Sequence, residues 1–228
     1  MEQQQEDGMK AFISYSHHDR KRGSDVKKVL NDFGIEAFLA HDDILVSQEW
    51  RDRIMQELKE CKIFVPLLSK AFKTSDWAPQ EIGVAASRSG VLIIPFSLDG
   101  TTPFGFISHL QGKILPDNFI PFGPVIDPIV KRFPNEMIPR VISRLVNSPG
   151  WRYSEALMGI LLPHFSKLTD QQVYDVTEGA IKNYEVWSAA DCLNIYLPKF
   201  VEANEARIDP KRLEILRYQL DNQERYQA

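Results

Sequence analysis

The feature that most constrains the fold of this chain is a series of short, apolar runs separated by amphipathic segments. The runs occupy residues 11–15, 35–39, 61–68 and 91–96. Short apolar runs bounded by polar loops are typical of buried strands. The segments with apolar residues at helical spacing occupy residues 21–33, 49–60 and 79–87. This alternation predicts an α/β fold, a flavodoxin-like parallel sheet with helices on both faces.

Polar residues after the first and third predicted strands are expected to meet at one cleft. In open α/β sheets, sites form outside the carboxyl ends of the strands, where the strand order reverses. In the flavodoxin-like order that point lies between the first and third strands. The loop after the first strand spans residues 16–19, and the segment after the third runs through Trp77 to Glu81.

The pattern changes after Gly150, where strand signals end. Helical periodicity follows in residues 153–168, 171–184, 189–204 and 210–223. Pro198 is expected to kink or split the third of these segments. The predicted domains are a disordered leader at 1–9, an α/β domain at 10–148 and a small all-α domain at 149–228. The helical domain is interpreted as a bundle or a pair of helical hairpins, and either as a packing or oligomerisation module or as the binding site for a trigger.

The segment 98–133 is less regular. It holds five prolines and four glycines, which predicts loops and a short helix. A short fifth strand is also expected near Val125 and Ile126.

Composition excludes several classes of function. Of the 228 residues, 43% are hydrophobic and 25% charged, with a net charge of −4, which disfavours a nucleic-acid-binding surface. No apolar run is long enough to span a membrane, and the polar start does not resemble a signal peptide. Cys61 and Cys192 are expected to be buried thiols of a cytoplasmic protein.

Glu81 is the leading candidate for a catalytic residue. Pro79 suits the first turn of a helix, because its φ is fixed near the helical value and it lacks an N–H. Glu81 then falls in the first turn, where the helix dipole favours a carboxylate. A depressed pKa and an anionic group at neutral pH are expected, suited to stabilising a developing cation. The alternative is an ordinary first-turn carboxylate without a catalytic role.

Four motifs, in order along residues 9–148, resemble those of Toll/interleukin-1 receptor (TIR) domains of the prokaryotic kind. Residues 12–19 look like the family's box 1, and residues 38–50 like its BB loop. Trp77 followed by Glu81 matches the Trp-x-x-x-Glu pattern of TIR domains that cleave NAD. Residues 103–107, followed by Gln111, are similar to a stretch of bacterial anti-phage TIR effectors. Residues 150–228 resemble no named family.

This resemblance implies an enzyme, an NAD+ nucleosidase of the NADase or ADP-ribosyl cyclase type acting in anti-phage defence signalling. It would break the bond between nicotinamide and ribose, with NAD as a substrate and no cofactor. Glu81 would be catalytic, and Ser16, His17, Leu45 and Trp77 would bind the substrate. The resemblance also implies self-association through TIR domains. The net charge and the lack of a long apolar run predict no nucleic-acid or membrane partner.

Other interpretations stay open at this point. A TIR domain can act as a non-catalytic scaffold or adaptor, or as an effector that mimics host TIR signalling. The products, ADP-ribose or a cyclic isomer, are not decided by the residues. Residues 17–19 and 41–43 offer nitrogen and oxygen ligands, but adjacent loop residues seldom point at one ion, so no metal is predicted.

Overall fold

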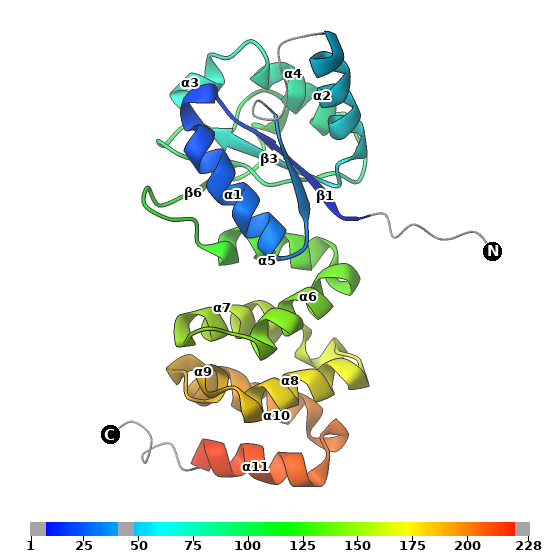
Figure 1. The fold of residues 1–228 in the computed structure, drawn as a ribbon, viewed down its shortest axis with the longest axis vertical. Coiled ribbons are helices and arrows are strands. Elements are labelled where there is room, and N and C mark those ends of the chain that lie inside the picture. The colour runs from blue at the N-terminus through cyan, green and yellow to red at the C-terminus, as the bar shows by residue number, and fades with distance from the viewer. Residues whose placement is uncertain (1–7, 41–47, 222–228) are drawn as a thin grey trace, which may run out of the picture. The chain divides into compact units, whose positions relative to one another are not determined.

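The computed structural model describes residues 8–40 and 48–221. The chain divides into two compact units, Met1–Arg132 and Phe133–Ala228. Figure 1 shows the strands gathered in the first unit and a succession of helices in the second.

The first unit is built on a parallel sheet. Its strands are β1 (Lys10–Ser14), β2 (Glu36–Leu39), β3 (Ile63–Leu68), β4 (Leu92–Ile93), β5 (Phe96–Ser97) and β6 (Lys113–Ile114). Their order is β2-β1-β3-β5-β6, with β4 also paired to β3, and all these pairings are parallel. The predicted flavodoxin-like order is therefore confirmed, with β1 and β3 at its centre.

Helices cover both faces of this sheet. They are α1 (Arg20–Asp32), α2 (Gln48–Glu60), α3 (Lys70–Lys73), α4 (Ala78–Ala86) and α5 (Phe122–Arg132), with 3-10 turns η1 (His17–Asp19) and η2 (Gly105–Ile107). The chain leaves β1 toward β2 on one side and returns past β1 to β3 on the other. Because parallel crossovers are right-handed, these opposite directions place α1 and α2 on opposite faces (Figure 1).

The core on the α2 and α4 face is continuous and apolar. Phe12 and Phe64 lie side by side on β1 and β3, with ring centroids 5.9 Å apart. They cluster with buried residues of the surrounding helices, among them Ile54, Leu58, Phe72, Ile82, Ala85 and Ile107. All six residues of β3 are buried, as expected for a central parallel strand with both faces covered.

The predicted fourth strand, residues 91–96, is divided into β4 and β5. The register of β3 with β4 and then β5 places Pro66 opposite Pro95 at the division. Neither proline has an N–H to donate to a ladder. The pairing therefore stops after Ile93 and resumes at Phe96.

The prediction of a strand near Val125 and Ile126 is wrong, because both residues lie in α5. Together with Ile129 and Val130 they form one buried stripe at helical spacing. The fifth position of the sheet is instead occupied by the two-residue strand β6.

The second unit is helical throughout its described part. It contains α6 (Pro134–Val146), α7 (Trp151–Leu161), α8 (Asp170–Lys182), α9 (Tyr184–Trp187), α10 (Leu197–Asn204) and α11 (Pro210–Asp221), with shorter turns η3 (Leu162–Lys167), η4 (Cys192–Tyr196) and η5 (Glu205–Arg207). Thr169 and Gln172 form a reciprocal capping box at the predicted start of α8. The split expected at Pro198 does not occur, because the π-helical η4 continues directly into α10, with Tyr196 and Leu197 both in the helical conformation. Pro198 lies in the first turn of α10.

These helices pack as successive hairpins. Helix α6 contacts α7 and α8, α8 in turn contacts α11, and α10 contacts both η3 and η4. Gly179 permits the close approach of α6 to α8, because a Cβ there would lie 3.1 Å from Val146 Cγ2. Of the two arrangements predicted, helical hairpins describe this unit better than a bundle.

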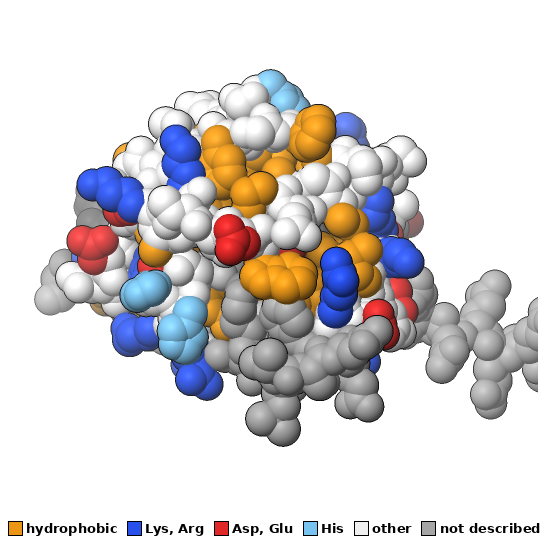
Figure 2. Space-filling model, turned by 90° about the horizontal axis from the view of Figure 1, so that it is seen from above, with side chains coloured by type: hydrophobic (Ala, Val, Ile, Leu, Met, Phe, Trp, Pro, Cys, Tyr) orange, Lys and Arg blue, Asp and Glu red, His pale blue; other side chains and the backbone are white. Residues whose placement is uncertain are grey.

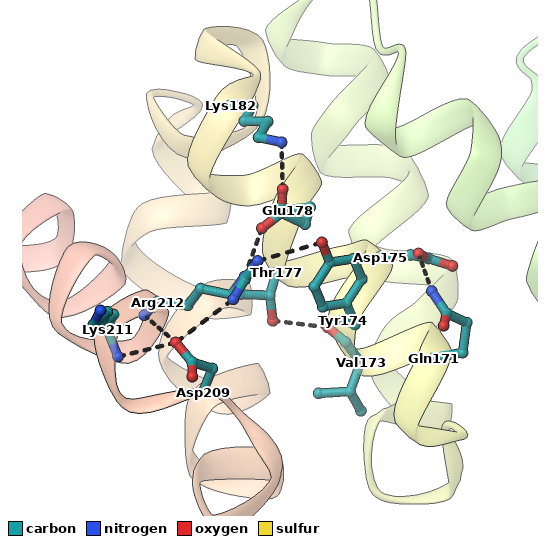
Figure 3. A network of polar contacts seen from close by, with 10 residues as sticks. All are labelled: Gln171, Val173, Tyr174, Asp175, Thr177, Glu178, Lys182, Asp209, Lys211 and Arg212. Carbon is teal, nitrogen blue, oxygen red and sulfur yellow. Dashed lines mark hydrogen bonds and ion pairs between the residues drawn. The ribbon is translucent and has the colours of Figure 1, made fainter.

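A polar network joins α8 to α11 on the surface of the second unit (Figure 3). Glu178 pairs with Lys182 at 2.5 Å in its own helix and with Arg212 of α11 at 2.6 Å. The Arg212 guanidinium also lies over the Tyr174 ring, 4.8 Å from its centroid, and 3.5 Å from Asp209. Arg212 therefore contacts two residues of α8, Glu178 and Tyr174, and ties α11 to that helix.

The boundary between the compact units falls after Arg132, whereas the sequence placed a domain limit after residue 148. Helix α6 belongs to the second unit because it packs on α7 and α8. The predicted domain limit stays a prediction, since compactness does not establish independent folding. Cys61 and Cys192 are free and buried, as predicted.

Phe64 offers a direct test of the sheet packing. Its side chain is fully buried, so Phe64→Ala leaves a cavity and is expected to lower the free energy of unfolding by about 3–5 kcal/mol. Phe119→Ala is the control, because that ring is 61% exposed, and it is expected to cost less than about 0.5 kcal/mol. Urea unfolding of the two variants measures the difference, and equal midpoints would contradict the packing.

Candidate active site

Polar side chains gather where β1 and β3 end. Ser14 is the last residue of β1, and Ser69 directly follows β3. The Ser69 hydroxyl donates to Asp19 Oδ2 at 2.6 Å and accepts from the Phe72 N–H at 3.0 Å. These two bonds hold the loop after β1 against the start of α3, so the edge between the first and third strands is fixed in shape.

Glu81 enters this edge from α4. The helix begins at Ala78, with Pro79 in its first turn, close to the predicted start. Glu81 is only 2% exposed, and its Oε2 accepts a hydrogen bond from the hydroxyl of Ser14, which is fully buried. The segment after the third strand therefore does meet the end of the first, as the sequence predicted.

The second carboxyl oxygen of Glu81 is unsatisfied. Glu81 Oε1 is buried and has no hydrogen-bond partner among the described residues. The N–H of Glu81 is itself used within the helix, donating to the Trp77 carbonyl at 3.0 Å. A buried polar atom without a partner costs about 1–3 kcal/mol, which is uncommon in native structures unless the group has another use.

The prediction of a depressed Glu81 pKa is wrong. Burial raises the pKa of Glu81 to about 7, because desolvation disfavours the charged form, while the Ser14 hydrogen bond acts in the opposite direction. A helix dipole stabilises an exposed carboxylate by only about 0.3–1 kcal/mol, less than one pKa unit. Loss of water therefore outweighs the dipole, and at pH 7 the carboxyl group is divided between its protonated and charged forms.

Ser16 and His17 lie on the loop directly after β1. Ser16 is 7% exposed, and its Oγ lies 3.3 Å from His18 Nδ1. His17 is exposed and meets the His18 ring edge-on, with centroids 6.3 Å apart. Within the part of the chain that the structure describes, neither side chain hydrogen-bonds to Glu81. Their roles as substrate contacts stay predictions.

Of the two other predicted substrate contacts, Trp77 lies within the described residues and Leu45 does not. Trp77 is the N-cap residue of α4 and is half-buried, so it is neither a fully buried core aromatic nor a freely exposed one. Leu45, the predicted contact in the BB loop, lies outside the described residues.

The sequence reasoning missed Ser14 as a partner of the candidate catalytic group. Ser14 was predicted only as part of a buried strand. Its signal was a hydroxyl at the carboxyl end of an otherwise apolar run, which places a hydrogen-bond donor at the site edge of a parallel sheet.

Two other features are absent from residues 8–40 and 48–221. No group of three or more His, Cys, Asp or Glu side chains could hold a metal ion there. The predicted alternative cluster included residues 41–43, which are not described. No helix in the same ranges is long and apolar enough to cross a membrane.

The raised Glu81 pKa predicts how stability depends on pH. The unfolded carboxyl has a pKa near 4.5 and the folded one near 7, so the folded state binds the extra proton between these values. Stability is therefore expected to fall as pH rises through this window, by up to about 3 kcal/mol at 1.36 kcal/mol per unit. In Glu81→Gln this contribution is absent. Urea unfolding at pH 5 and pH 8 measures it, and equal pH dependence in both proteins would contradict the buried carboxyl.

Part of the chain matches a known protein family. Residues 11–117 match the family model described as the TIR domain. Among solved structures, the chain is similar to the TIR domain of a Toll-related receptor from the lower metazoan Hydra magnipapillata. The two are 18% identical with a TM-score of 0.41, and the match covers 54% of this chain and 91% of that one. No curated protein matches the chain.

The family match covers β1, β3 and α4, the elements that carry Ser14 and Glu81. The finer prediction of a prokaryotic, NAD-cleaving type stays a prediction. The first unit of the chain therefore has the fold of a TIR domain.

Proposed function

We propose that this protein is an NAD+ glycohydrolase or cyclase that cleaves the bond between nicotinamide and ribose, with Glu81 as its catalytic residue. The observation that carries the proposal is the unsatisfied Oε1 of Glu81, buried at the carboxyl edge of the sheet. A ribose hydroxyl is a donor of the kind that this oxygen lacks. The match of Trp77 and Glu81 to the Trp-x-x-x-Glu pattern supports the same assignment.

The chemistry requires charge stabilisation at the ribose. Cleavage of a glycosidic bond passes through an oxocarbenium-like transition state. A carboxylate in a site without water interacts strongly with such a positive charge. The Ser14 hydroxyl holds Oε2 in place, so Oε1 is the oxygen that faces the substrate. The products are nicotinamide with ADP-ribose or a cyclic isomer, a signal suited to anti-phage defence.

Access to Glu81 requires a change from the structure described. A carboxyl group that is 2% exposed does not meet a dinucleotide from solvent. The TIR enzymes that this sequence resembles become active when copies stack head to tail, with one BB loop completing the next cleft. The first unit has hydrophobic side chains on the face seen in Figure 2, and its exposed residues include Phe106 and Ile114. Assembly through such a surface would couple opening of the site to concentration.

The alternative is a scaffold that assembles through its TIR domain without catalysis. The burial of Glu81 and its bond to Ser14 favour this reading, because a neutral carboxyl donor or acceptor can serve structure alone. The two functions differ in what removal of the charge does, so a single substitution separates them.

Glu81→Gln is expected to reduce NAD cleavage at least about tenfold, because the amide cannot stabilise the developing cation. Its size and hydrogen bond to Ser14 are preserved, so the melting temperature should stay the same or rise. Gln80→Glu is the control, since Gln80 is exposed on the same helix turn. Products are separated by chromatography after incubation with NAD. A folded Glu81→Gln variant with full turnover would overturn the assignment, and no cleavage by the wild type at any concentration would favour the scaffold.

Turnover per molecule is expected to rise with protein concentration, because the described state keeps Glu81 closed. A head-to-tail contact does not close on itself and can grow. Phe106→Asp, at a side chain that is 74% exposed, should flatten this rise if its face takes part in the contact. NAD turnover across a dilution series, with light scattering in parallel, measures both. Constant specific activity from a monomer at every dilution would rule out activation by assembly.

A further inference from the structure

A pocket lies at the carboxyl edge of the sheet, beside β5 and β6. Its volume is about 430 Å³, within the roughly 300–1,000 Å³ range of small-molecule sites. Its lining includes Ser97, Thr102, Pro103, Leu110, Gln111 and Ile114. No lining residue carries a charged side chain.

Ser97 gives this pocket an unsatisfied polar group. Its side chain is 4% exposed, and its Oγ is buried with no hydrogen-bond partner in the described part of the chain. The Ser97 carbonyl is used within the sheet, accepting from the Leu115 N–H at 3.0 Å. The hydroxyl is therefore the free group, and a buried hydroxyl of this kind calls for a ligand or an ordered water.

The strand register places this pocket on the same face of the sheet as Glu81. Ser14 lies opposite Pro66, and Leu68 lies opposite Ser97. Side chains opposite each other in a sheet share a face, as do residues two apart in one strand. Ser14, Pro66, Leu68 and Ser97 therefore point to one face, and Leu68 belongs to the core cluster that contains Ile82 of α4.

The two sites are also close enough to bind one molecule. From Ser14 to Ser97 is two strand spacings across the sheet and two residues along it, which gives roughly 12 Å between them. Helix α4, which carries Glu81, packs directly on η2, and Ser108 and Leu110 of the pocket follow η2. The pocket is thus a neighbour of the candidate active site along the same edge.

The lining selects an uncharged, partly aromatic ligand with hydrogen-bonding groups. Pro103, Leu110 and Ile114 offer apolar walls for a planar ring. The carboxamide of Gln111 presents a donor and an acceptor together, the pair that matches N7 and the N6 amino group of adenine. Ser97 can accept from or donate to a ribose hydroxyl. No charged side chain of the lining is available to pair with a phosphate.

We infer that this pocket binds an adenine nucleoside, and that it holds the adenosine half of the dinucleotide whose nicotinamide riboside half reaches Glu81. The second clause rests on the proposed function, whereas adenosine binding does not. Gly112 shapes the pocket, because a Cβ there would lie 3.2 Å from Pro103 Cδ. The close approach of residue 112 to Pro103 holds Gln111 beside the apolar wall.

Calorimetric titration of the full chain with adenosine and with inosine tests the inference. Inosine replaces the N6 donor by an acceptor, so Gln111 can make only one of its two bonds. The wild type is expected to bind adenosine at least about fivefold more tightly than inosine. Gln111→Ala should abolish this preference, and Ser97→Ala should weaken binding of both nucleosides. Gln56→Ala, on the exposed surface of α2, should change neither.

Thermal unfolding of the same variants is the control that shows whether they are folded. Ser97→Ala should not lower the melting temperature, since the lost hydroxyl has no partner among the described residues. No adenosine binding at millimolar concentration, or equal preference for adenosine in Gln111→Ala, would overturn the inference. If adenosine binds as expected but the wild type does not cleave NAD, the result would support the adenosine site and contradict the proposed function. If the wild type cleaves NAD and the KM for NAD is unchanged in Gln111→Ala, the result would support the proposed function and contradict a role of the pocket in it.

Discussion

The parallel pairing of β1 with β3 is the interaction on which the first unit depends. Both strands are buried, and their register sets Ile13 against Val65 and Ser14 against Pro66. Because side chains alternate between faces, a slip of one residue would send Ser14 to the opposite face. The Ser14 hydroxyl would then leave Glu81, and the relation between Ser14 and Ser97 would be lost as well.

The packing that stabilises the sheet also removes the Glu81 carboxyl group from water at the edge of the sheet. Helix α4 is held by buried apolar residues such as Ile82 and Ala85, and these draw Glu81 out of water. The carboxyl group loses hydration that a single hydroxyl does not replace, so its pKa rises to about 7. Buried polar groups in proteins usually have hydrogen-bond partners, and positions where a partner is missing are expected to be functional sites.

The two prolines at the division between β4 and β5 shape the other end of this edge. Pro66 and Pro95 cannot donate to a ladder, so β3 changes its partner from β4 to β5 at that point. Beyond the change, β5 and β6 are only two residues long. Between these two strands the chain leaves the sheet through Gly100, which has a φ of 88°, and the loop from there to β6 forms the wall of the Ser97 pocket.

The sequence by itself determined the alternation of strands and helices, the order of the sheet and the edge at which Glu81 lies. These follow from local patterns, namely apolar runs, helical spacing and Pro79 at a helix start. Only the tertiary structure decided that Glu81 is buried with a raised pKa, that Ser14 is its partner, and that Val125 lies in a helix. The physical reason is that desolvation, hydrogen-bond partners and the split at Pro66 depend on residues distant in the chain, which a local pattern does not contain.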